Sequence, residues 1–164
     1  MVSMKFLSEQ KDEELKEELK DSLSVHTSWG AGRIDMSERL TFYWPYDKEE
    51  YSERVRRTSE FLEGLKYMDL YAVAFSRDQY AEYDKTFERK YNNKSVELSS
   101  QEIVEVDQDL IEFIIIPESM DWAVIFDHEG DISFNGDKAF IRQVKQFFDD
   151  WEDLSEVPEK RSAR

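Results

Sequence analysis

Apolar residues recur along the chain at helical spacing in some stretches and as short, uninterrupted runs in others. Spacings of three and four residues put apolar side chains on one face of a helix, and they predict helices over residues 8–23, 47–67 and 138–154. Ser8 and Asp47 stand at the start of the first two segments, where their side chains are suited to cap a helix. The pattern therefore predicts at least three amphipathic helices.

Short runs of β-branched and aromatic residues predict strands between these helices. Two such runs cover residues 40–44 and 70–75, and three more cover residues 111–116, 121–126 and 131–134. The last three runs follow one another closely, with proline or glycine in the short connections between them. This arrangement predicts an antiparallel meander in the C-terminal third of the chain.

Three further stretches complete the expected organisation. Residues 78–91 form a possible helix, residues 96–106 are compatible with an edge strand or a short helix, and Asn135–Asp137 predicts a turn. The order of elements predicts an α+β fold, with a mostly antiparallel sheet of about five strands covered by three or four helices. We expect one domain over residues 1–156 and a disordered tail over residues 157–164.

The chain is strongly acidic, with 38 aspartate and glutamate residues against 22 lysine and arginine residues and a formal net charge of −16. Such a surface repels phosphate, so binding to nucleic acid or to an anionic membrane is disfavoured. The chain contains no cysteine, which excludes disulfides, thiol nucleophiles and cysteine-based metal sites. We recognise no signal peptide and no window approaching the ~18 apolar residues of a membrane span, so we expect a cytoplasmic protein.

The acidic residues dominate one long stretch, because no lysine or arginine lies between Lys94 and Lys138. The same stretch contains the most apolar run of the chain, Phe113–Ile116, so these carboxylates are expected on a folded sheet rather than on a tail. They either serve solubility alone or form a binding surface for a basic partner. The carboxylates expected at such a partner-binding surface are Asp107, Asp109, Glu112, Glu118, Asp121, Asp127, Glu129 and Asp131.

His128 is the strongest candidate for chemistry, because an imidazole among carboxylates can bind a metal or act as a general base. The more ordinary interpretation is an exposed residue in a turn. The surrounding sequence does not fit a calcium loop, since Ile132 replaces the required glycine and Lys138 the required glutamate. We therefore predict no catalytic residue, no metal site and no cofactor, and a protein that is not an enzyme.

The segment from Trp122 to Gly136 resembles a hairpin of small bacterial immunity proteins, the antitoxin-like partners of secreted toxins. In both, a strand led by tryptophan is followed by an acidic turn and by a second strand that ends near glycine. The resemblance implies a protein that binds and neutralises a toxin. It transfers no binding or catalytic role to any individual residue.

The charge of the chain favours the same function by an independent argument. A nuclease-type toxin domain must bind polyphosphate, so its cleft is basic, and a surface of fixed carboxylates is suited to occupy it. We therefore expect a non-enzymatic immunity protein whose partner is a basic toxin domain. The alternatives are an adaptor or regulatory interaction domain whose acidity serves solubility, and a metal-dependent hydrolase centred on His128.

Overall fold

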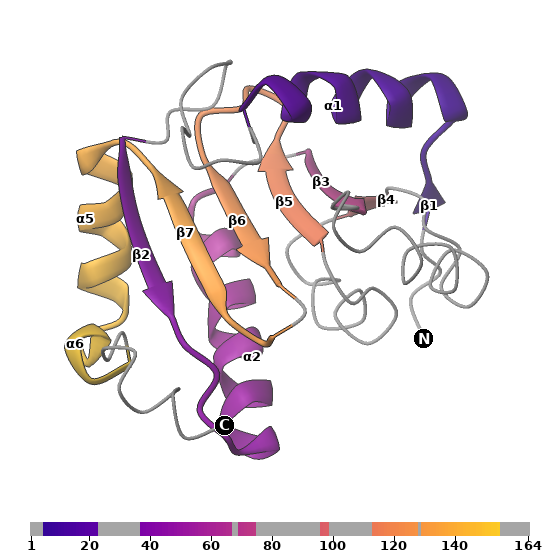
Figure 1. Cartoon of the computed structure of the whole chain (residues 1–164). Coiled ribbons are helices and arrows are strands. Elements are labelled where there is room, and N and C mark those ends of the chain that lie inside the picture. Colours follow the sequence, from indigo (N-terminus) through magenta and orange to yellow (C-terminus); the bar gives the residue numbers. More distant parts are fainter. Residues whose placement is uncertain are drawn as a thin grey trace.

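The structure is a computed structural model, and its strands form one sheet with helices packed against it (Figure 1). It describes residues 5–22, 37–66, 69–74, 96–98, 113–127 and 129–154. The strands are β1 (Lys5–Phe6), β2 (Glu38–Phe42), β3 (Leu70–Ala74), β4 (Val96–Leu98), β5 (Phe113–Pro117), β6 (Ala123–Phe126) and β7 (Ile132–Gly136). The helices are α1 (Glu9–Ser22), α2 (Lys48–Gly64), α5 (Lys138–Phe147) and α6 (Trp151–Leu154).

The predicted α+β class is confirmed. The seven strands stand in the order β1-β4-β3-β5-β6-β7-β2, and every neighbouring pair is antiparallel. The central five, from β3 to β2, have four or five residues each and correspond to the five strands that the sequence predicted. The two short strands, β1 and β4, extend the sheet beyond β3. β4 lies at the start of residues 96–106, for which the sequence was compatible with either an edge strand or a short helix.

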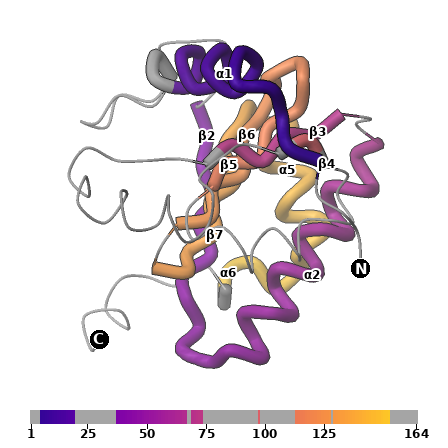
Figure 2. Tube along the Cα trace, turned by 90° about the vertical axis from the view of Figure 1, so that its right-hand side faces the viewer, coloured from indigo at the N-terminus to yellow at the C-terminus, as the bar shows by residue number. Residues whose placement is uncertain are grey.

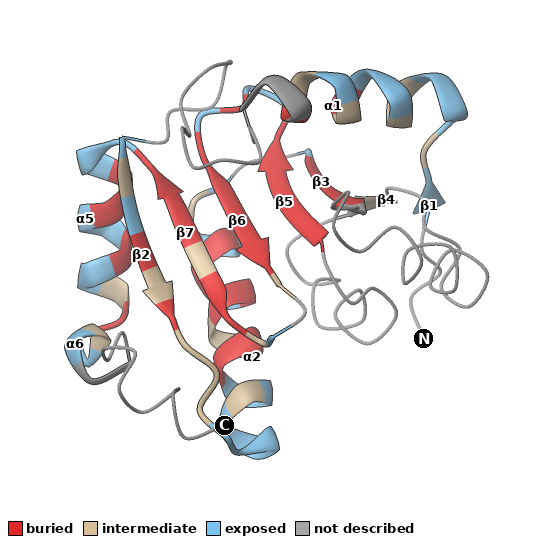
Figure 3. Cartoon of the chain, viewed as in Figure 1, coloured by how far each residue is buried: buried red, intermediate tan, exposed pale blue. Residues whose placement is uncertain are grey.

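One face of the sheet carries the larger core, beneath α2 and α5. Alternate residues of the central strands point into it, among them Phe113 and Ile115 of β5 and Val124 of β6. Val55 and Leu62 of α2 are buried against the same cluster, as the spacing of apolar residues in this helix predicted. Figure 3 shows the buried residues concentrated on the strands and on the sides of α2 and α5 that face them.

The other face of the sheet carries a second core, covered by α1. Leu15 and Leu19 of this helix pack with Tyr71, Ile114 and Ile116 from the strands beneath. Figure 2 shows α1 lying apart from α2, with strands between them. Because β5 contributes to both cores, all five of its residues are buried, which explains the uninterrupted apolar run in its sequence.

The predicted last helix is interrupted, so the prediction of one continuous helix is wrong. Instead of one helix over residues 138–154, α5 ends at Phe147 and α6 begins at Trp151. Phe148 leaves the helical conformation, with φ −97° and ψ 83°, and its side chain is completely buried. Its ring lies 4.9 Å from that of Phe42 and 5.7 Å from that of Phe134, measured between centroids. The break therefore directs an aromatic side chain into the core.

Two strand boundaries also differ from the predictions. Asn135 and Gly136 were expected in a turn, but they belong to β7 and pair with Arg39 and Glu38 of β2. The side chain of Asn135 is fully buried and donates to the carbonyl oxygens of Ala123 and Ser133, so the sheet itself satisfies this polar residue. Similarly, β2 ends at Phe42 rather than at residue 44.

Several predictions fall on residues outside the described ranges. These are the possible helix over residues 78–91, the tail over residues 157–164, and the side chains of Asp107, Asp109, Glu112 and His128. Within the described ranges, no helix has the length and apolarity that crossing a membrane requires.

Candidate functional site

The five described carboxylates of the predicted binding surface occupy two turns at opposite ends of β6. Glu118 and Asp121 lie in the β5–β6 turn, whereas Asp127, Glu129 and Asp131 lie in the β6–β7 turn. The four residues of β6 rise by roughly 3.3 Å each, so the two turns are separated by about 13 Å of strand. The structure therefore divides these carboxylates into two groups instead of bringing them together.

The β5–β6 turn is tied to α1 through Glu118. The Glu118 carboxylate lies 3.3 Å from the Lys11 ammonium of α1, and that ammonium lies 5.3 Å from the centroid of the Tyr71 ring. The pKa of Tyr71 is raised, mainly by burial of its hydroxyl and secondly by the hydrogen bond of that hydroxyl to Glu118. In the same turn, Asp121 accepts a hydrogen bond of 2.8 Å from the Ser119 hydroxyl. These carboxylates thus take part in contacts that hold α1 and the turn.

The β6–β7 turn is organised by Asp127. One carboxylate oxygen of Asp127 accepts hydrogen bonds from the backbone N–H of Glu129 at 2.9 Å and of Asp131 at 3.0 Å. The backbone N–H of Gly130 also donates to the carbonyl oxygen of Asp127, at 3.1 Å. Burial raises the pKa of Asp127, and the negative charges of Asp131 and Glu129 act in the same direction against the lowering effect of the two N–H donors.

Replacing Asp127 with asparagine is expected to increase stability at neutral pH, because the amide oxygen can accept the same two hydrogen bonds without a charge at a partly buried position. A carboxyl whose pKa is raised by folding binds its proton more tightly in the folded state. Its penalty is absent below its ordinary pKa of 3.8 and develops as the pH rises from there through the folded value. Urea unfolding of both proteins between pH 3 and pH 7 measures the difference. A difference that shrinks as the pH rises would contradict this assignment.

Asp131 and Gly130 fix the same turn against Trp44, in the segment that connects β2 with α2. The carboxylate of Asp131, a residue only 6% exposed, accepts a hydrogen bond of 2.9 Å from the backbone N–H of Trp44. This bond holds the chain just beyond Phe42, where the β2 ladder ends. Gly130 has a φ of +84°, and a Cβ atom there would lie 2.6 Å from Cε3 of the Trp44 ring. Glu129 remains the exposed carboxylate of the turn.

Trp44 also connects this turn to the beginning of α2. Its ring lies 4.9 Å from that of Tyr51 between centroids, in a tilted arrangement. Asp47 caps α2 as the sequence predicted, accepting hydrogen bonds from the backbone N–H of Glu49 at 2.8 Å and of Glu50 at 3.1 Å. The exposed side chains of Glu49 and Glu50 are thereby carried on a capped helix that contacts the turn through Trp44.

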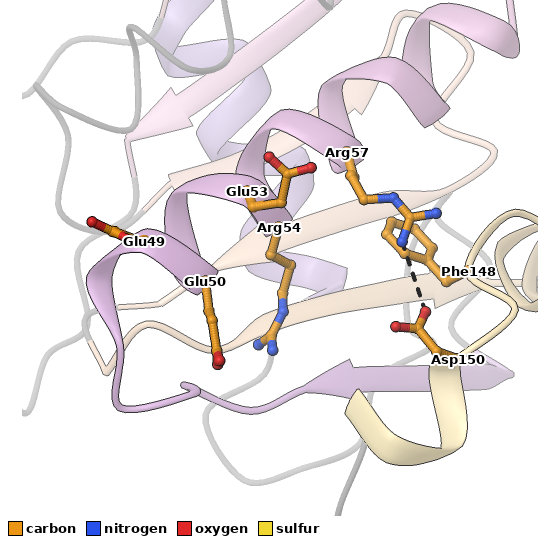
Figure 4. A pocket seen from close by; sticks show the side chains of 7 residues that line it. All are labelled: Glu49, Glu50, Glu53, Arg54, Arg57, Phe148 and Asp150. Carbon is orange, nitrogen blue, oxygen red and sulfur yellow. Dashed lines mark ion pairs between the residues drawn. The ribbon is translucent and has the colours of Figure 1, made fainter.

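A groove of about 460 Å³ lies between the first half of α2 and the junction of α5 with α6 (Figure 4). Figure 4 shows the Arg54 and Glu50 side chains extending from α2 on the same side, with the Arg57 guanidinium directed towards Asp150. The residues that line the groove are Glu49, Glu50, Glu53, Arg54, Arg57, Phe148 and Asp150. We define the acidic corner as the exposed carboxylates of the groove and the turn, namely Glu49, Glu50, Glu53, Glu129 and Asp150.

Two arginines of the groove have different environments. The Arg57 guanidinium lies 3.7 Å from the Asp150 carboxylate, donates to the carbonyl oxygen of Phe147 at 3.2 Å, and lies over the Phe148 ring. Arg54 is only 6% exposed, and its Nη1 donates to the carbonyl oxygen of Tyr43. Its buried Nε has no hydrogen-bond partner among the residues that the structure describes. Burial lowers the pKa of Arg54, while nearby negative charges, including those of Glu50, Asp131 and Asp150, act in the opposite direction.

The carboxylates of α2 were missed when the binding surface was predicted from sequence, although part of the signal was present. Glu49, Glu50 and Glu53 follow the predicted cap at Asp47, and their spacing places them on one side of the helix. The helix that carries them is joined to the β6–β7 turn through tertiary contacts of Trp44, which no local pattern encodes.

The described part of the chain holds no group of three or more histidine, aspartate and glutamate side chains arranged to bind a metal ion. His128 lies outside it, so the hypothesis of a hydrolase centred on this residue stays a prediction. No protein-family model, characterised protein or solved structure matches the chain significantly.

Proposed function

We propose that this chain is a non-enzymatic binding protein whose acidic corner occupies the cationic surface of a basic protein. The observation that supports this proposal is that exposed carboxylates of two segments, α2 and the β6–β7 turn, are carried on elements that both contact Trp44. Glu49 and Glu50 lie in the first turn of α2, which Asp47 caps. Glu129 lies in the β6–β7 turn, which the carboxylates of Asp127 and Asp131 hold in place. Fixed charges lose little freedom on binding, and complementary charge accelerates encounter with a basic partner.

The specific partner that we propose is a nuclease-type toxin domain, which would make this chain an immunity protein. Nucleases hold the phosphate backbone of their substrate with basic and hydrogen-bonding groups. Carboxylates presented at fixed positions can take the place of phosphates in such a cleft. The hairpin resemblance and the net charge of −16 support this choice of partner.

An exposed aromatic residue near the acidic corner supports a binding role over mere solubility. Tyr46, one residue before the cap of α2, is 47% exposed and has a φ of 63°, a left-handed conformation that residues other than glycine adopt infrequently. Tyrosine is enriched in protein interfaces, where its ring buries a large area while its hydroxyl stays hydrogen-bonded. A surface serving solubility alone has no need of an exposed aromatic residue held in this way.

The experiment is to measure association with a basic protein encoded beside this chain, together with inhibition of that protein's nuclease activity. We expect tight binding that weakens steeply as salt is raised, because exposed charges are screened over about 10 Å at 0.1 M ionic strength. Glu129→Lys is expected to weaken binding by about tenfold, mainly through slower association. The matched reversal Asp121→Lys, in the turn at the other end of β6, should have a smaller effect.

The alternative of an adaptor with a solubilising surface predicts a different result. In that case, Glu129→Lys and Asp121→Lys would change association equally little, and the dissociation constant would hardly depend on salt. Association without loss of nuclease activity would contradict the immunity role while preserving the binding role.

A further inference from the structure

We infer that the outer edge of β2 and the flank of α5 beside it receive an extended acidic peptide segment, which adds to the sheet as a further strand. The main chain of the peptide pairs with β2, and its carboxylates pair with cations of α5. This surface uses no residue of the acidic corner, so it is a second binding surface beyond the proposed function.

β2 is the last strand on one side of the sheet. Its residues pair antiparallel with β7, and no other described strand pairs with it. Alternate residues of an edge strand direct their N–H and C=O groups away from the sheet, where an added strand can pair with them. The segment Glu38–Phe42 contains no proline that would remove one of these donors. β2 therefore offers main-chain donors and acceptors to an extended peptide.

α5 carries three exposed cations, Lys138, Arg142 and Lys145, which we define as the cation row. Although aspartate and glutamate outnumber lysine and arginine by 38 to 22 in the chain, α5 contains neither acidic residue. The three cations form no ion pair with any residue that the structure describes. The Lys145 ammonium lies over the ring of Trp151 of α6, 4.4 Å from its centroid. The row thus offers positive charge on a fixed element.

The cation row lies on the flank of α5 that is turned away from α2. Spacings of four and three residues put the row within an arc of roughly 60° on a helix with about 3.6 residues per turn. Phe147 lies on the opposite flank, where its ring centroid is 5.4 Å from that of Phe61 of α2. Figure 1 shows α5 alongside β2, at the end of the sheet. The row therefore points outwards, past the edge strand.

The strand edge and the cation row together select an acidic peptide in an extended conformation. Alternate side chains of an added strand lie about 6.8 Å apart on one face, close to the roughly 6 Å rise between Lys138 and Arg142. A polyphosphate neutralises the row but has no main-chain groups that pair with β2. A second copy of this chain, joined through the same edge, would bring two cation rows together, and their repulsion opposes that pairing.

The test is a titration of the full chain with acetyl-Ser-Glu-Val-Glu-Val-Glu-Ser-amide, followed by NMR of the backbone amides. The uncharged control peptide has glutamine in place of the three glutamates, and inorganic tripolyphosphate supplies negative charge without a main chain. We expect the acidic peptide to shift the amides of β2 and α5 and to slow hydrogen exchange at alternate amides of β2. Tripolyphosphate is expected to shift amides of α5 alone.

Two matched double variants separate the cation row from general charge. Arg142→Gln, Lys145→Gln removes two charges of the row and is expected to raise the dissociation constant of the acidic peptide by about fivefold or more. Lys48→Gln, Lys66→Gln removes two exposed charges near the two ends of α2, and we expect less than about a twofold change. Circular dichroism of both variants confirms that helix content is retained before binding is compared.

Three results would overturn the assignment of this surface. These are equal binding of the glutamine peptide, equal loss of affinity in the two double variants, and unchanged exchange of every β2 amide at saturation with the acidic peptide. Positive charge beside an edge strand can also serve only to keep the edges of two copies apart. In that case the acidic peptide would not bind, and the Arg142→Gln, Lys145→Gln variant would self-associate, which would overturn the assignment as well.

Discussion

Replacing Phe148 with alanine is expected to lower the free energy of unfolding by about 3 to 5 kcal/mol, the cost of truncating a buried phenylalanine in a packed core. Phe148 is fully buried at the break between α5 and α6. Its ring contacts those of Phe42 and Phe134 on the sheet and lies 5.1 Å beneath the guanidinium of Arg57. Its removal leaves a cavity between the sheet and both C-terminal helices, which the flanking elements can fill only in part.

Phe147→Ala is the control, because the neighbouring ring is only partly buried against the same cluster. We expect it to cost about 1 to 2 kcal/mol, since a smaller apolar area is lost. Urea unfolding monitored by tryptophan fluorescence gives both values. Equal costs for the two substitutions would contradict the view that the break in the helix serves to place Phe148 in the core.

Replacing Gly130 with alanine is expected to lower the free energy of unfolding by about 2 to 4 kcal/mol, the sum of a left-handed backbone and an overpacked contact. The φ of +84° disfavours any residue with a Cβ atom. In addition, that atom would lie 2.6 Å from the Trp44 ring, which also contacts the ring of Tyr51. The substitution should therefore also change the near-ultraviolet circular dichroism of Trp44 and weaken binding through the displaced turn.

Gly64→Ala is the matched control, because a Cβ atom at this last position of α2 meets nothing within 4 Å. We expect this variant to be neutral or more stable by up to about 1 kcal/mol, owing to the higher helix propensity of alanine. A Gly130→Ala protein as stable as the Gly64→Ala protein would show that the turn adjusts without cost. In that case, Glu129 would not be held at a fixed position.

The fold could be predicted to a large extent because its elements follow from local periodicity. The apolar stripe of α2 predicted this helix, and the aspartate before it predicted the cap at Asp47. The continuous apolar run Phe113–Ile116 predicted the central strand β5. The sequence failed where tertiary contacts override a local pattern. Phe148 continues the apolar stripe of a helix, but the chain leaves the helix there because the core accommodates its ring.

The candidate site was less predictable, because a carboxylate in the sequence does not reveal what it will contact. Asp127 and Asp131 accept hydrogen bonds from the backbone of the turn and of Trp44, a role that the sequence did not indicate, and their contact with a partner stays a prediction. Glu118, predicted at the same surface, also pairs with Lys11 of α1. Of the three carboxylates predicted in the β6–β7 turn, Glu129 is the exposed one.

Binding of a basic protein at the acidic corner should be visible in the backbone of the elements that carry it. Hydrogen exchange of the backbone amides, measured with and without the basic protein encoded beside this chain, tests it most directly. We expect slower exchange in the β6–β7 turn and in the first turns of α2 on binding, with α1 unchanged. Slower exchange confined to α1 or to the β5–β6 turn, or no change at any amide at saturation, would contradict it.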